Sequence, residues 1–83
     1  MLARAKVMGH YVRAEKLTGD DRSATYSFSN GDAPTRTLFI NLDEDRIWPE
    51  DGNRDHIFGG AAVAIVREYG REGRLPDVAF HQA

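Results

Sequence analysis

In the stretch RIWPEDGNRDHIFGG, residues 46–60, the spacing of apolar residues along the sequence changes. Before it, apolar residues alternate with polar ones, as they do in strands that bury one face. After it, Phe58, Ala61 and Ile65 recur at steps of three and four residues, which is the spacing of an amphipathic helix. The change predicts strands before this stretch and a helix from about Arg54 to Gly70.

The segments around the helix predict an antiparallel sheet. Alternating residues indicate strands over 5–16, 23–29, 35–42 and 77–83, and residues 47–48 add a short extended piece that Pro49 ends. Turn residues in LTGDDR and NGDAP separate the first three strands. The order β-β-β-(β)-α-β is typical of an α+β fold. We expect a single domain over residues 1–83, with three to five antiparallel strands and one helix packed on a face.

The apolar positions of these elements predict the core. Phe39 falls on the opposite face of its strand, between Thr37 and Asn41, which indicates that this face is partly covered too. The residues expected in the core are Val12, Tyr26, Phe28, Leu38, Ile40, Leu42, Phe58, Ala61, Ile65, Tyr69, Val78 and Phe80.

The composition bounds the class of protein. Eighty-three residues with 41% hydrophobic and 29% charged side chains are typical of one globular domain. The net charge of −2 and the pI near 5.8 disfavour a protein that binds a nucleic-acid backbone. Because cysteine is absent, there is no disulfide and no thiolate zinc site. No apolar run is long enough to span a membrane, and we expect a cytoplasmic protein.

The spacing of Asp51, Asn53 and Asp55 matches the beginning of a calcium-binding loop. Such a loop needs a glycine at its sixth position and an acid at its twelfth, where this chain has His56 and Ala62. We therefore expect no metal here. The better interpretation is a helix start, with Asn53 or Asp51 as the capping residue.

The three histidines do not form a recognisable site. His10, His56 and His81 have no spacing typical of metal ligands, although His10 and His81 would meet if the first and last strands were neighbours. Asp55 and His56 point about 100° apart on a helix, so they form a poor catalytic pair. We assign no catalytic residue, metal or cofactor. A small enzyme or metal-binding protein that uses these histidines with Asp55 is the alternative function.

The paired glycines Gly59 and Gly60 are unexpected inside a helix, where each costs roughly 1 kcal/mol relative to alanine. They favour close packing of the helix against the sheet or a second copy over an anion-binding loop. Val63 and Val66 lie away from the apolar stripe of the helix. We therefore expect a homodimer, or a larger oligomer, that packs through the helix, and a purely structural subunit is a third interpretation.

Acidic residues surround the only tryptophan. An acidic rim around one aromatic side chain is suited to a basic protein partner. The alternative is a solvated turn with the tryptophan packed on the core. The sequence thus predicts a small protein-interaction module, a regulator or inhibitor, that binds through this loop. The residues expected to contact the partner are Asp43, Glu44, Asp45, Trp48, Glu50 and Asp51.

Overall fold

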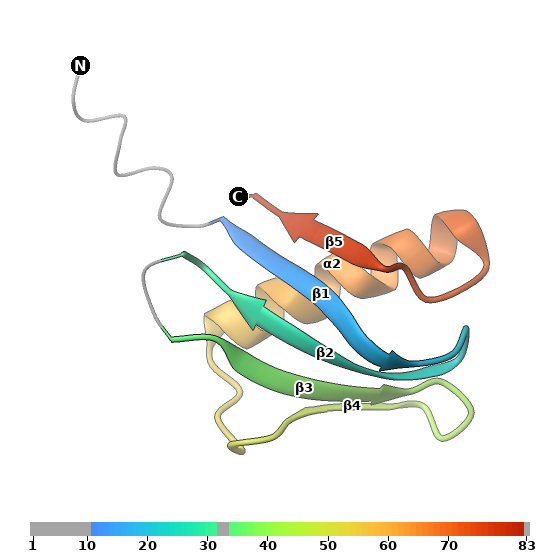
Figure 1. Ribbon diagram of the computed structural model, residues 1–83, viewed down its shortest axis with the longest axis horizontal. Coiled ribbons are helices and arrows are strands. Elements are labelled where there is room, and N and C mark those ends of the chain that lie inside the picture. The colour runs from blue at the N-terminus through green and yellow to red at the C-terminus, as the bar shows by residue number, and fades with distance from the viewer. Residues whose placement is uncertain (1–10, 32–33, 83) are drawn as a thin grey trace.

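The computed structural model describes residues 11–31 and 34–82, and within these ranges it has five strands and one helix (Figure 1). In chain order they are β1 (Val12–Gly19), β2 (Ser23–Ser29), β3 (Arg36–Asn41), β4 (Arg46–Pro49), α2 (His56–Glu72) and β5 (Val78–His81). The α+β fold expected from the sequence is confirmed, and the short piece before Pro49 is a full member of the sheet.

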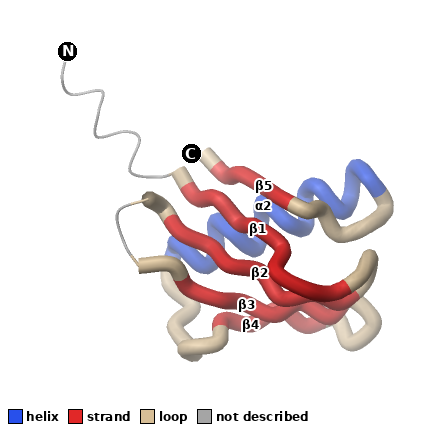
Figure 2. The backbone as a smooth tube through the Cα atoms, viewed as in Figure 1, coloured by secondary structure: helices blue, strands red, loops and turns tan. Residues whose placement is uncertain are grey.

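The strands form one open antiparallel sheet in the order β4-β3-β2-β1-β5. The first four strands follow one another as a meander. Helix α2 then crosses behind the sheet and returns the chain to the far edge, where β5 pairs with β1 (Figure 2). The helix therefore covers one face of the sheet, and no described helix or strand covers the other, which is called the open face below. Among the described residues, no helix combines the length and the apolar character needed to cross a membrane.

Strand β1 ends later than the sequence predicted. It continues past Lys16 to Gly19, with a bulge between Lys16 and Thr18. Gly19 has φ 121° and lies so close to β2 that an added Cβ would be 2.3 Å from the Ser23 carbonyl oxygen. Only glycine fits there, so the hairpin turn is confined to the three residues that follow. The part of the predicted first strand before residue 11 lies outside the described residues.

Helix α2 begins and ends at specific capping residues. The Asp55 carboxylate accepts a hydrogen bond from the Phe58 amide at 3.0 Å, so Asp55, and not Asn53 or Asp51, is the N-cap. At the other end, Gly73 adopts φ 79° and its amide donates to the Tyr69 carbonyl at 2.8 Å.

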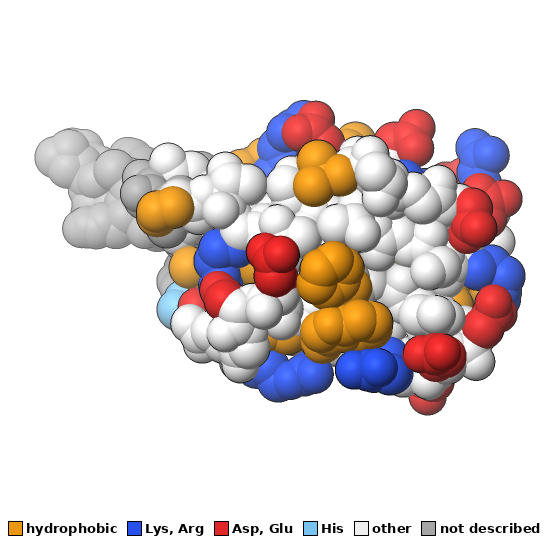
Figure 3. Space-filling model, turned by 60° about the horizontal axis from the view of Figure 1, so that its bottom comes forward, with side chains coloured by type: hydrophobic (Ala, Val, Ile, Leu, Met, Phe, Trp, Pro, Cys, Tyr) orange, Lys and Arg blue, Asp and Glu red, His pale blue; other side chains and the backbone are white. Residues whose placement is uncertain are grey.

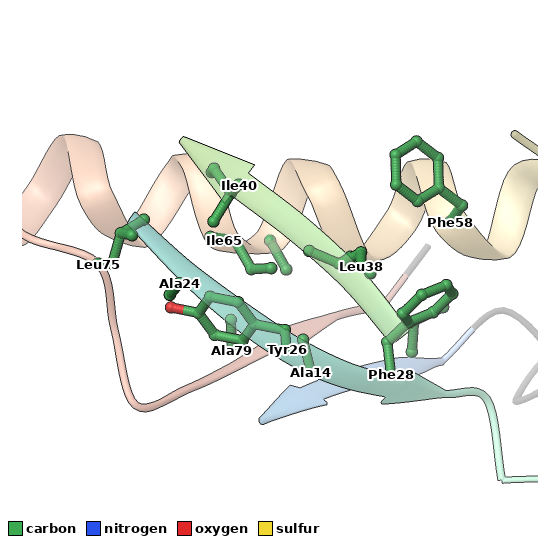
Figure 4. Close-up of a cluster of buried hydrophobic side chains, with 13 residues drawn as sticks. Ala14, Ala24, Tyr26, Phe28, Leu38, Ile40, Phe58, Ile65, Leu75 and Ala79 are labelled. Carbon is green, nitrogen blue, oxygen red and sulfur yellow. The ribbon is translucent and has the colours of Figure 1, made fainter. Parts of the chain in front are cut away.

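The core lies between α2 and the covered face of the sheet (Figure 4). Eight of the expected core residues are buried: Val12, Tyr26, Phe28, Leu38, Ile40, Phe58, Ala61 and Ile65. Leu42 and Tyr69 pack against them and are partly buried. The Tyr26 hydroxyl donates to the Pro76 carbonyl, and burial raises the pKa of this phenol.

The last strand is present as predicted, but the prediction that Val78 and Phe80 belong to the core is wrong. Val78 and Phe80 are 37% and 49% exposed, while Ala79 is buried opposite Ala14 of β1. The cause is the close approach of α2. A Cβ added to Gly60 would lie 3.1 Å from side-chain atoms of Val12 and of His81. His81 thus packs on α2 where the glycine leaves room for it, Ala79 faces the same side, and Val78 and Phe80 point to the open face.

An arginine contacts each edge strand of the sheet. Arg54 donates to the Ile47 carbonyl of β4 at 3.3 Å, and Arg67 of α2 donates to the Phe80 carbonyl of β5 at 3.2 Å. Strand β4 also contains Pro49, which has no amide hydrogen to offer a further strand. Both edges are thus partly occupied by groups of the same chain.

Candidate functional site

Trp48 lies on the open face of the sheet, directly opposite Phe39 of β3. The neighbours of Phe39 along β3, Leu38 and Ile40, face the helix, so Phe39 and Trp48 face away from it. The two ring centroids are 5.4 Å apart with planes tilted by 38°, and the Arg46 guanidinium lies 4.0 Å from the centroid of the Trp48 ring. Packing of Trp48 on the core is therefore excluded.

A surface hollow of about 240 Å³ adjoins this aromatic pair. Hydroxyl groups of Thr18, Ser23 and Thr25 contribute to its lining. Figure 3 shows the side of the molecule where β3 and β4 lie, with adjoining hydrophobic side chains among cationic and anionic ones. The region offers an aromatic surface, neutral polar groups and charges of both signs.

The β3–β4 turn beside Trp48 is held by its own hydrogen bonds. The Asn41 side-chain oxygen accepts from the amides of Asp43 and Glu44, at 3.0 and 3.2 Å. Asp45 closes the turn with φ 54°, and its amide donates to the Leu42 carbonyl. These bonds involve the backbone of the acidic residues and not their carboxylates, and all three residues are exposed.

One of these three carboxylates has a cationic partner. Arg22 donates to the Asp43 carboxylate at 2.7 Å and to the Tyr69 hydroxyl at 3.1 Å, and the bond to Asp43 raises the pKa of Arg22. In the described part of the chain, no ion pair engages Glu44 or Asp45. Two acids of the turn are therefore available to an external cation.

The acidic residues after β4 are arranged differently, around Arg36. This guanidinium donates to both Asp51 carboxylate oxygens, to both Asp55 carboxylate oxygens and to the Asn53 carbonyl, at 2.7–3.2 Å. Its side chain is 17% exposed and lies over the Phe28 ring. The bonds from Arg36 lower the pKa of Asp51 and of Asp55. Arg36 of β3 thus occupies the centre of the turn formed by residues 51–55, whose sequence resembles the start of a calcium-binding loop.

The six residues predicted to bind a partner therefore do not form one ring. Strand β4 is four residues long, roughly 13 Å, and separates the acids before Trp48 from Glu50 and Asp51 behind it. Glu50 is exposed, while Asp51 is bound to Arg36. The sequence analysis missed Phe39 and Arg46 as neighbours of Trp48. Arg46 was detectable, because it stands two residues before Trp48 on the same face of the strand.

The histidines lie apart from this region. Asp55 binds Arg36 with both oxygens, and His56 beside it is exposed. His81 packs against Gly60, and its buried Nδ1 has no hydrogen-bond partner among the described residues. Strands β1 and β5 are neighbours, but His10 lies outside the described residues. No three His, Asp or Glu side chains within residues 11–31 and 34–82 are grouped as metal ligands.

Comparisons with protein-family models, with curated proteins and with solved structures found no match to this chain.

Proposed function

We propose that this chain is a small protein-interaction module that binds a basic partner through its Trp48 face. The Trp48 face consists of Trp48, Phe39 and the turn acids Glu44 and Asp45. The observation that carries the proposal is the aromatic pair on the open sheet face, next to two acids that form no ion pair with any described residue.

The chemistry of the Trp48 face favours binding over catalysis. Large aromatic side chains supply much of the binding energy at protein interfaces, and tryptophan is enriched among the residues that matter most. Acidic residues at the rim attract a basic partner and orient its approach. The cation of Arg46 over the Trp48 ring is consistent with a ring that accepts guanidinium or ammonium groups.

A module of this kind acts by covering a surface of its partner. The partner that fits presents an apolar group for Trp48 and at least one Lys or Arg for the turn. Blocking such a basic surface would make this chain a regulator or an inhibitor of that partner.

The test starts from affinity capture with wild-type protein and with a Trp48→Ala variant. We expect a basic protein that the wild type retains at low salt and the variant releases. With that protein purified, Trp48→Ala should weaken binding by more than about 2 kcal/mol in calorimetry. Glu44→Lys combined with Asp45→Lys should mainly slow association and reduce its dependence on salt.

Trp48 also reports its own environment, because it is the only tryptophan in the chain. Docking of the partner should shift its fluorescence emission. Leu17→Ala is the matched control, since Leu17 is an exposed apolar residue on β1 outside the Trp48 face. Equal affinity of the wild type and the Trp48→Ala variant for every captured protein would refute the proposal.

A further inference from the structure

The side of α2 that faces away from the sheet is apolar where a surface helix is normally polar. Val63 and Val66 are 50% and 51% exposed on this side. No charged residue occurs from Ile57 to Val66, a stretch of nearly three turns. The nearest cation, Arg67, is directed to the Phe80 carbonyl of β5. The exposed valines therefore lie in an uncharged surface.

Two glycines on the same side of α2 are not required by any close contact within the described chain. Gly59 and Gly70 have ordinary helical φ angles, and a Cβ added to either would meet nothing within 4 Å. Gly60 is different, because Val12 and His81 leave no room for a larger residue there. Glycine lowers helix stability, so its presence at two open positions indicates a contact that the single chain does not contain.

The four residues Gly59, Val63, Val66 and Gly70 form a pattern that is symmetric along the helix. Their spacing is four, three and four residues, with its midpoint between Ala64 and Ile65. A two-fold axis through this midpoint would align two antiparallel copies of α2, as in an isologous dimer. Val63 would then lie against Val66 of the partner subunit, and Gly59 against Gly70 of the partner subunit. The surface is thus complementary to itself.

We propose that the chain forms a homodimer through this face of α2, with the two helices antiparallel and brought close together by the glycines. The contact extends over about 17 Å of helix, at 1.5 Å per residue. Such a contact is short beside a standard interface of roughly 800 Å² per partner, so we expect a weak dimer that forms as the protein concentration rises. The Trp48 face lies on the other side of the sheet and stays free, so the dimer does not depend on the proposed function.

The test measures mass by analytical ultracentrifugation from low micromolar to millimolar concentration. Wild-type protein should pass from monomer to dimer. Val63→Lys alone and Val66→Glu alone should each raise the dimer dissociation constant by more than about tenfold, because each places unpaired charges in an apolar contact. An equimolar mixture of the two variants should recover the dimer, since the new lysine of one lies beside the new glutamate of the other.

Two further variants separate this interface from loss of folding. Leu17→Lys replaces an equally exposed apolar residue on β1 and should leave the dimer unchanged. Gly59→Leu should raise the melting temperature of the dilute monomer, because leucine favours helix more than glycine, while it weakens the dimer. A monomeric wild type at millimolar concentration, or a mixture that stays monomeric, would overturn the proposal.

Discussion

The two acidic turns at the ends of β4 look equivalent in sequence but differ in structure. Before the strand, the carboxylate of Asp43 binds one exposed arginine, and its two neighbours extend into solvent. Behind the strand, Asp51 and Asp55 converge on Arg36, which is largely enclosed and uses all its donors. The number of acids in a loop therefore does not tell how many of them a partner can reach.

The difference arises from the position of each arginine. Arg36 begins β3, and its side chain lies over Phe28 on the covered side of the sheet, where low exposure strengthens charged hydrogen bonds. Arg22 lies in the exposed turn before β2, where water and salt weaken its ion pair. The first turn is suited to recognition, and the second is part of the framework of the fold.

Replacing Arg36 should have the largest effect on stability. Arg36→Ala leaves two carboxylates without their cation and removes five hydrogen bonds, so we expect a loss of about 2–3 kcal/mol in the free energy of unfolding. Urea denaturation monitored by circular dichroism measures it. Arg36→Lys is the matched control for charge. It should recover only part of the loss, because an ammonium cannot reproduce the bidentate geometry. Full recovery would show that charge alone holds the turn.

Replacing Asp55 should have the next largest effect, because this residue both caps α2 and binds Arg36. Asp55→Ala should lower the free energy of unfolding by about 1–2 kcal/mol. Asp55→Asn keeps an oxygen for the Phe58 amide and removes the charge, so it should be less destabilising. Equal destabilisation by the two variants would assign the whole effect to the ion pair.

Acid should weaken the second turn selectively. The pKa values of Asp51 and Asp55 are lowered in the folded state, chiefly by Arg36. Their contribution to stability is therefore complete above the unfolded value of roughly 4, and it is lost as the pH falls through the lowered folded values. In wild-type protein, the urea concentration at the unfolding midpoint should therefore decrease as the pH is lowered below roughly 4. It should fall less in Arg36→Ala, and parallel curves for the two proteins would contradict this assignment.

Replacing Arg22 should have the smallest effect. Arg22→Gln breaks an exposed ion pair, so the urea midpoint should stay close to that of the wild type. The same change frees the Asp43 carboxylate and should increase the affinity for a basic partner. A large loss of stability would show that the first turn also supports the fold, through the contact of Arg22 with Tyr69.

The architecture was predictable because its signals are local. The alternation in residues 23–29 and 36–41, and the helical spacing after residue 56, each follow from burial of one face of one element. The candidate site was only partly predictable. Trp48 and its acidic neighbours are visible in the sequence, whereas the pairing of Arg36 with residues 15 and 19 positions away depends on tertiary structure.

Strand β5 shows why some features of the fold, such as which face of a strand is buried, could not be predicted from the sequence. Its residues Val78 to His81 carry apolar groups on both faces, so hydrophobicity alone does not decide which face is buried. The helix decides it, since Gly60 of α2 leaves room for His81, and alternation then places Ala79 on the covered face and Phe80 on the open one. The choice of face thus depends on a contact between residues about twenty positions apart.

The two arginines that contact the edge strands, Arg54 and Arg67, have a consequence for behaviour at high protein concentration. An open sheet exposes unpaired backbone groups along both of its edge strands. These groups can pair with a strand of another chain, and repeated pairing of this kind produces fibres. Here a strand that docked on β4 or β5 would first have to displace Arg54 from Ile47 or Arg67 from Phe80. These two side chains therefore oppose edge-to-edge association of the sheets of neighbouring molecules. A protein with an uncovered aromatic sheet face can in this way remain dispersed while that face is free to bind.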